Sequence, residues 1–335
     1  MQLNSKTTSS LPLVAAALLG KYRLASAQPG ASSSAFGSDN YGDSSYGPWG
    51  LDNAVMTTFL ERPNATGTYP LSGPETTSPA SESGPVDGWA WDIRVRADIP
   101  ISETNVTNYH QDLLSQYFTG SQIRLKSPSS EGIDPSWLVC VIRWQVDDDY
   151  SEELRQDDGT CSSVLDESCR SDMADVVANT WADRSGTDRC RCPDLSSISS
   201  CGEPPAAFDQ GCSATVYNAT HINNSTGTGP GSWSAGEYLV LTYGGAAGAR
   251  GDTTLYDQTG SLAWPFMVVW GRRSLHAVPT SQLTCVRAAN ATDGSQAPGA
   301  DGTGGDGGSG GSLNDQKSPI VILVSIFAAI WMTLV

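Results

Sequence analysis

Basic residues and histidines are scarce in this chain. Lysine and arginine together number 19 against 36 acidic residues, and the formal net charge is −17. A chain this acidic is repelled by nucleic-acid phosphates and by anionic lipid headgroups, which argues against both as partners. The 3 histidines, His110, His221 and His276, are too far apart for the i, i+4 pair of a helical zinc site, and no H-E-x-x-H motif occurs. We therefore expect no metal and no other cofactor.

The chain also lacks an apolar run of ordinary membrane-spanning length. Its longest, from Ile320 to Val335, would form a helix of about 24 Å, whereas the hydrocarbon core of a bilayer is about 30 Å thick. No Lys or Arg follows, although basic residues usually flank a single-pass anchor. Small residues, a polar spacer and the apolar run come in the order of a GPI-attachment signal, so we predict a removed tail at 313–335. The candidate attachment residues are Gly308, Ser309 and Gly310. A short transmembrane helix is the alternative.

The amino terminus has the features of a secretory signal peptide. Lys6 precedes a short apolar segment, Leu11 to Leu19, and the small-residue pattern Ala25-Ser26-Ala27 follows it. The apolar segment is too short to span a bilayer, and the small residues suit signal peptidase. We expect residues 1–27 to be removed and the chain to be exported, to the outer face of the plasma membrane or to the cell wall.

Cysteines and glycosylation sequons agree with export. An even number of cysteines, 8, in an exported chain predicts four disulfides of unknown connectivity. Cys190 and Cys192 are too close to bridge each other comfortably, so each should take a separate partner, and a zinc site there lacks a second close pair. The cysteines are Cys140, Cys161, Cys169, Cys190, Cys192, Cys201, Cys212 and Cys285. The N-x-S/T sequons lie at Asn64, Asn105, Asn218, Asn223, Asn224 and Asn290, and they favour a glycosylated surface.

Composition divides the exported chain into three parts. Residues 28–85 are rich in Ser, Gly, Pro and Thr, so we expect them to be disordered with one short strand at most. Residues 86–288 should form a single Cys-rich domain that is large enough for a hydrophobic core. Residues 289–312, dominated by Gly, Ser and Asp, read as a flexible stalk.

Periodicity predicts a mainly β domain, either an antiparallel sheet or a sandwich. Apolar residues alternate with polar ones from Trp89 to Ile99, which is typical of a half-buried strand. Further strands are expected at 137–146, 238–242, 265–270 and 283–287. Within an insertion at 147–231, residues 164–181 have helical spacing, and Cys190 to Cys212 should be loop held by disulfides.

Two motifs that resemble functional sites are better explained by ordinary structure. Ser234 lies in a near match to the G-x-S-x-G nucleophile elbow, but a turn precedes it and a strand follows, which reverses the elbow's order. The acidic run Asp147 to Glu153 lacks the spacing of a calcium loop, and we interpret it as a solvated turn.

The 10 tryptophans are the remaining candidates for ligand contact. Trp89, Trp91, Trp137, Trp144 and Trp270 fall in expected strands, where core packing is their usual role. Trp233 and Trp264 are expected at strand edges, so we take them as candidates for stacking on sugar rings, with wall polysaccharide as a candidate partner.

Together these features resemble a group of uncharacterised, Cys-rich secreted proteins of filamentous fungi. The resemblance rests on the signal peptide, the segment Trp137-Leu-Val-Cys140-Val and the segment from Asp158-Gly-Thr-Cys161 to Cys169, and it covers about 137–201. Such proteins are commonly GPI-anchored. The spacing from Cys161 to Cys169 is not that of the fungal eight-cysteine haem-binding module. The resemblance implies a location and no reaction, so no catalytic residue is carried over.

Two functional classes follow from the sequence. The first is a non-enzymatic cell-surface glycoprotein with a structural or adhesive role. The second is a carbohydrate-binding or carbohydrate-active extracellular protein, which as an enzyme would need two carboxylates within about 5–10 Å of each other in a Trp-lined cleft. The sequence favours the first class and identifies no catalytic residue.

Overall fold

A computed structural model of the chain describes residues 53–80, 84–104, 111–144, 153–183, 189–202, 208, 211–218, 233–234, 236–273, 279–292 and 295–298. Its main helices are α1 (Asn53–Leu60), α3 (Glu167–Asp183) and α6 (Thr253–Gly260). Its strands are β1 (Ala65–Pro74), β2 (Pro85–Pro100), β3 (Tyr117–Lys126), β4 (Trp137–Trp144), β5 (Cys212–Asn218), β6 (Trp233–Ser234), β7 (Glu237–Gly248), β8 (Trp264–Arg272), β9 (Thr280–Val286) and β10 (Asn290–Ala291). The predicted fold class, mainly antiparallel β with a disulfide-rich helical insertion, is confirmed.

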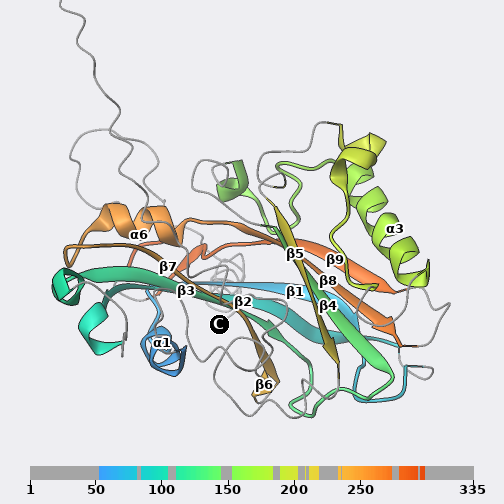
Figure 1. Cartoon of the computed structure of the whole chain (residues 1–335), viewed down its shortest axis with the longest axis horizontal. Coiled ribbons are helices and arrows are strands. Elements are labelled where there is room, and N and C mark those ends of the chain that lie inside the picture. Colours follow the sequence, from blue (N-terminus) through green and yellow to red (C-terminus); the bar gives the residue numbers. More distant parts are fainter. Residues whose placement is uncertain are drawn as a thin grey trace, which may run out of the picture. The chain divides into compact units, whose positions relative to one another are not determined.

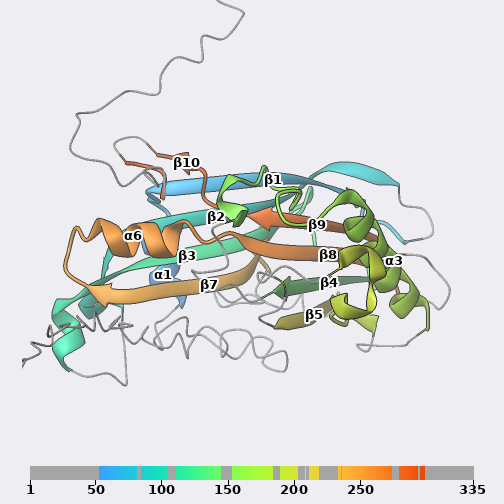
Figure 2. The same ribbon diagram turned by 90° about the horizontal axis from the view of Figure 1, so that it is seen from above.

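The strands form two antiparallel sheets that pack as a sandwich (Figures 1 and 2). The large sheet has the strand order β10-β1-β2-β3-β7-β6, and the small sheet has the order β5-β4-β8-β9. Helix α3 lies on the side of the small sheet, and α1 lies on the other side of the large sheet (Figure 1). The small sheet therefore has both faces covered, whereas the large sheet packs on the small sheet through one face and carries α1 on part of the other.

Strand β2 follows from the alternation in its sequence. Trp89, Trp91 and Ile93 point into the core between the sheets, whereas Asp92 and Arg94 point to the opposite face of the large sheet. Successive side chains of a strand lie on opposite faces, so a period of two puts one face in the core. The strand pairs with β1 on one edge and with β3 on the other, as a long central strand should.

Strand β4 is buried along its whole length, because the large sheet packs on one of its faces and the insertion on the other. Val139 and Val141 belong to the core between the sheets, while Cys140 and Ile142 lie under the insertion. A nearly continuous apolar strand is typical of this position. Strands β5 and β8 flank it, so β4 lies inside the small sheet.

Aromatic pairs from opposite sheets make up much of the core. The ring centroids of Trp89 and Trp270 are 5.3 Å apart, and those of Tyr217 and Tyr238 are 4.3 Å apart, both edge-on. Such contacts add to the stabilisation that comes from burying the rings. Every tryptophan predicted for the core is at most 5% exposed, namely Trp89, Trp91, Trp137, Trp144 and Trp270.

The insertion covers the outer face of the small sheet and is tied to it by disulfides. Helix α3 begins and ends close to the predicted range, and Trp181 near its end packs on Gly271 of β8. The four disulfides join Cys140 to Cys190, Cys161 to Cys285, Cys169 to Cys201, and Cys192 to Cys212. Cys190 and Cys192 have separate partners, as their spacing predicts. All eight cysteines lie on this side of the molecule.

The folded region begins earlier than the predicted boundary at residue 86. Helix α1 packs through Met56 and Leu60 on the outer face of the large sheet, and β1 pairs with β2 from Ala65 onward. The expectation of at most one short strand in 28–85 is corrected here. Strand β1 contains few apolar residues, and its pairing with β2 stabilises it. Gly67 in this strand leaves space for the carbonyl of Arg287.

Candidate functional site

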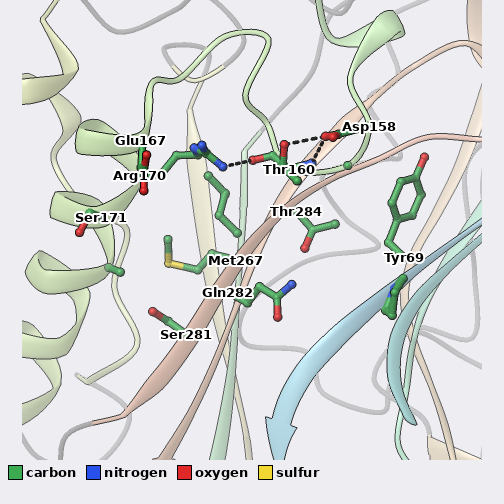
Figure 3. Close-up of a pocket in the computed structure, with 14 residues that line it drawn as sticks. Tyr69, Asp158, Thr160, Glu167, Arg170, Ser171, Met267, Ser281, Gln282 and Thr284 are labelled. Atoms are coloured by element: carbon green, nitrogen blue, oxygen red, sulfur yellow. Dashed lines mark hydrogen bonds between the residues drawn. The ribbon is translucent and has the colours of Figure 1, made fainter. Parts of the chain in front are cut away.

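A groove of about 560 Å³ opens where the insertion meets the edges of both sheets (Figure 3). Its walls come from the first turns of α3, the loop 158–160, strand β9 and strand β1. Figure 3 shows Glu167 and Arg170 at one end and Tyr69 at the other. The lining includes Tyr69, Asp158, Thr160, Glu167, Arg170, Ser281, Gln282, Leu283 and Thr284.

The loop at the groove is built around the buried carboxylate of Asp157. Its Oδ1 accepts hydrogen bonds from the backbone N–H groups of Gly159 (2.7 Å) and Cys161 (2.8 Å). Residue 159 has φ +103°, a backbone conformation that favours glycine. A Cβ at this position would also overlap the ring of Tyr69, so both the backbone and the packing require glycine. The disulfide from Cys161 to Cys285 then fastens the loop to β9. The groove wall is thereby held both by hydrogen bonds and covalently.

Charged groups sit on the loop and on α3. Asp158 Oδ1 accepts hydrogen bonds from the hydroxyl (2.6 Å) and the N–H (3.0 Å) of Thr160, and the hydroxyl bond is the first cause of a lowered pKa of Asp158. Arg170 Nη1 donates to the carbonyl of Thr160 at 3.1 Å (Figure 3). With Glu167, the groove carries two carboxylates and one guanidinium, a formal charge of −1.

Tyr69 closes the other end of the groove. Its hydroxyl donates to the carbonyl of Arg287 at 2.8 Å and accepts from the N–H of Arg287 at 3.2 Å. Burial raises the pKa of Tyr69, since desolvation penalises the phenolate. Thr284, also in the groove wall, is 3% exposed, and its hydroxyl has no hydrogen-bond partner within the described ranges. A buried hydroxyl without a partner is unusual, because leaving it unpaired costs free energy.

The groove can therefore bind a polar ligand by hydrogen bonds and charge. Its lining supplies hydroxyls, one carboxamide, two carboxylates and a guanidinium beside a few apolar atoms, a mixture typical of recognition sites. In the part of the chain that the structure describes, no three His, Cys, Asp or Glu side chains come together as metal ligands.

A second polar feature lies on the outer face of the large sheet. Lys126 Nζ is 3.2 Å from Asp92 Oδ1 and 3.9 Å from Glu237 Oε1, so these two oxygens are no farther apart than the two distances together. Arg94 Nε lies 3.0 Å from Asp92, and Arg124 Nη1 lies 2.6 Å from Glu237. Asp92 and Glu237 thus share a network with three basic side chains, which we call the charged face.

The two tryptophans proposed for sugar stacking belong to strands of different sheets. Trp264 is 4% exposed, and its ring packs edge-on against Tyr243 with centroids 5.2 Å apart. The interpretation of Trp264 as a surface for sugar stacking is corrected, because its side chain belongs to the core between the two sheets. Trp233 is in β6, the last strand of the large sheet, opposite Tyr238. Ser234 pairs with Glu237 in the same short ladder, which agrees with a turn into a strand.

Three of the predicted sequons fall within the described residues. The side chain of Asn64 is engaged: its Nδ2 donates to Ser295 Oγ at 3.0 Å, and its Oδ1 accepts from the N–H of Ala97 at 2.8 Å. Asn290 is exposed on β10 and lies opposite Thr66. Asn218 is the last residue of β5.

Several predictions concern residues outside the described ranges. They are the signal peptide, the tail at 313–335, the attachment candidates Gly308, Ser309 and Gly310, the sequons at Asn105, Asn223 and Asn224, the three histidines, and the acidic run from Asp147 to Glu153 except for its last residue. Within the described ranges, no helix is both long enough and apolar enough to cross a membrane.

Sequence reasoning missed the groove residues. Glu167, Arg170 and Gln282 had no distinguishing motif, and they come from separate segments that only the fold brings together. The Asp158-Gly-Thr turn stood out in the sequence, but nothing there indicated that Tyr69 lies against it.

Comparison with known proteins gives no relatives for this chain: no protein-family model, no curated protein and no solved structure matches it.

Proposed function

We propose that the chain is a non-enzymatic cell-surface glycoprotein with an adhesive role, of the kind found on filamentous fungi. A GPI anchor would hold it at the outer face of the plasma membrane or in the wall, and the sandwich would present the groove to a partner. The observation that carries this proposal is the groove itself, with a wall fixed by the buried Cys161–Cys285 disulfide. Disulfides persist in oxidising compartments, which is compatible with an extracellular protein.

The location is tested by phospholipase C treatment of intact cells that express the full chain. The proposal expects release of the protein into the medium and a C-terminal peptide that ends at Gly308, Ser309 or Gly310 by mass spectrometry. A peptide that still ends at Val335 would refute the GPI anchor.

The adhesive role is tested with beads that carry the secreted protein and are mixed with intact cells or wall fragments. Replacing two of the three groove charges, Glu167→Gln with Arg170→Gln, should reduce retention of the beads by at least about fivefold, because charge-assisted hydrogen bonds would be lost. The matched control is Glu131→Gln, an exposed carboxylate outside the groove lining, which should leave retention unchanged. Equal retention of all three proteins would reject the groove as the adhesive site.

A carbohydrate-active enzyme is the second candidate, and the charged face is the observation that favours it. Lys126 Nζ lies 3.2 Å from Asp92 Oδ1 and 3.9 Å from Glu237 Oε1, so these oxygens are at most 7.1 Å apart, which does not exceed the roughly 5–10 Å that separate glycosidase carboxyls. Both carboxylates are held in ion pairs, however, and the five tryptophans predicted for the core are buried away from this face. Release of reducing sugar from wall polysaccharide, abolished by Glu237→Gln, would support the enzyme over the adhesive protein.

A further inference from the structure

Among the strands that the structure describes, β9 has a neighbour on one edge alone, and its other edge lies in the groove. It is the last strand of the small sheet and pairs with β8 alone. Ser281 and Leu283 of β9 line the groove and are partly exposed. An unpaired strand edge presents a row of backbone donors and acceptors, which makes it a template for pairing with another chain.

The register with β8 shows which backbone groups point into the groove. Cys285 lies opposite Pro265, and its N–H donates to the carbonyl of Gly159 at 3.0 Å, away from β8. In an antiparallel ladder, hydrogen-bonded and non-hydrogen-bonded pairs alternate, so every second residue points its backbone groups outward. Leu283 and Ser281 precede Cys285 by two and four residues and have the same backbone orientation. Their N–H and C=O groups therefore also point away from β8.

These outward groups have no partner among the residues that the structure describes. Within the described ranges, the one backbone–backbone hydrogen bond on this edge of β9 is that from Cys285 to Gly159, at the end where the loop closes the groove. Gly159 thus occupies the place of a neighbouring strand's first residue, and the positions beside Leu283 and Ser281 are open. The unpaired hydroxyl of Thr284 lies in the same wall.

We propose that the groove binds an extended peptide segment of a partner protein, which adds to β9 as a further strand. The backbone groups of Ser281 and Leu283 would pair with it, as in other cases of strand addition. The spacing of the outward-pointing backbone groups along β9 favours a peptide over a sugar. Residues with the same orientation in a strand recur every 6.8 Å or so, which is the repeat of a second strand.

The side chains around the groove favour a peptide with a basic residue. Asp158 and Glu167 outweigh Arg170, and the guanidinium of Arg170 already donates to the carbonyl of Thr160. Side chains of an added strand would point alternately towards α3 and towards Tyr69 and Gln282. A Lys or Arg within reach of the two carboxylates would balance the groove's charge. This inference rests on the proposed function in taking the groove as the adhesive site.

The test begins with a phage-displayed library of random heptapeptides, panned on the secreted full chain with its disulfides formed. The most enriched peptide is synthesised, and then again with a single N-methyl group at each position in turn. N-methylation removes one N–H and leaves the side chain in place. Strand addition predicts about tenfold weaker binding at every second position and a change within about twofold at the positions between. Uniform tolerance of N-methylation would overturn strand addition.

A variant of the protein tests the same contact from the other side. Ser281→Pro removes an N–H that points into the groove and breaks no hydrogen bond to β8, and proline is tolerated on strand edges for this reason. It should weaken the heptapeptide about tenfold, whereas the matched Ser281→Ala should bind within about twofold of the native chain. Equal binding by both variants, with unchanged unfolding temperatures, would contradict the assignment. The N-methyl series uses the native chain and so decides the question even where Ser281→Pro does not fold.

The outcomes separate this inference from the proposed function. Enriched peptides with a basic residue and the alternating N-methyl pattern support both. If no peptide is enriched, while wall oligosaccharides bind and Gln282→Ala weakens them, the peptide inference fails and the adhesive role of the groove stands. If neither probe binds, and the groove variants retain cells as the native protein does, both fail.

Discussion

The two outer faces of the sandwich are stabilised in different ways. The outer face of the small sheet is covered by an insertion that four disulfides fasten down. The outer face of the large sheet carries the charged face and the helix α1, and no cysteine lies there. The covered side is made of the helix α3, short 3-10 helices and loops, whereas the other side is made of long strands paired residue by residue.

The difference shows where covalent links are needed. Paired strands satisfy one another's backbone hydrogen bonds, so the outer face of the large sheet can carry polar side chains without disulfide links. The insertion has few regular hydrogen bonds, and ordering it costs conformational entropy that the disulfides reduce in the unfolded state. The groove lies at the border of the two regions, with one wall from each.

The largest expected effect comes from removing the longest cross-link. Replacing Cys161 and Cys285 by alanine opens a loop with a sequence separation of 124 residues, and both side chains are fully buried. We expect a loss of about 4–5 kcal/mol in the free energy of unfolding, measured by denaturant titration. The matched pair Cys192 and Cys212, with a separation of 20, should cost about 3 kcal/mol. Equal losses, or a larger loss for the shorter loop, would contradict the entropic explanation.

A smaller effect is expected from the buried member of the charged face. Asp92 has a side chain 7% exposed, and besides its ion pairs it accepts a hydrogen bond from Thr68 at 3.1 Å. Asp92→Asn leaves Arg94 and Lys126 without this carboxylate and should cost about 1–3 kcal/mol in the free energy of unfolding. A cost as large as that of the Cys161–Cys285 link would show that the charged face is as important as the covered side.

The exposed member of the same network should matter least among these changes. Glu237 is 31% exposed, so solvent screens its pairs with Arg124 and Lys126. We expect Glu237→Gln to cost about 0.5–1 kcal/mol at low salt and less at 1 M salt, measured by denaturant titration at both. A loss that does not change with salt would indicate a packing defect instead of a charge effect.

The loss of stability at acidic pH gives a further test of the covered side. Backbone donation from Cys169 is the first cause of a lowered pKa of Asp166, which caps the start of α3 at 2.7 Å. A lowered folded-state pKa gives stability that is present above the unfolded pKa, near 4, and is lost as the pH falls through the folded value. The unfolding temperature should therefore fall as the pH is lowered below about 4. Asp166→Asn keeps a cap but does not titrate, so its drop should be smaller by a few degrees; identical profiles would contradict this.

Local patterns in the sequence predicted those parts of the fold that they determine. The alternation from Trp89, the apolar run around Val139 and the helical spacing before Trp181 each yielded the right element. Strand β1 was missed because Thr, Gly and Pro fill it, and β3 because only Ile123 and Leu125 alternate clearly as apolar residues. Both depend on pairing with β2, which no local window contains.

The groove was beyond reach for a related reason. Tyr69, Arg170 and Gln282 are far apart in the sequence, and each is unremarkable there. The disulfide partners were equally hidden, although the spacing of Cys190 and Cys192 excluded a bond between them. Chemistry that depends on long-range contacts leaves no local pattern.

Hydrogen–deuterium exchange before and after reduction tests the central contrast most directly. With the disulfides reduced by a phosphine at neutral pH, we expect exchange to rise by at least about tenfold in 153–202 and in β9, including the groove wall. Strands β1, β2, β3 and β7 should keep their protection. Loss of protection throughout both sheets, or no change in the insertion, would contradict the account.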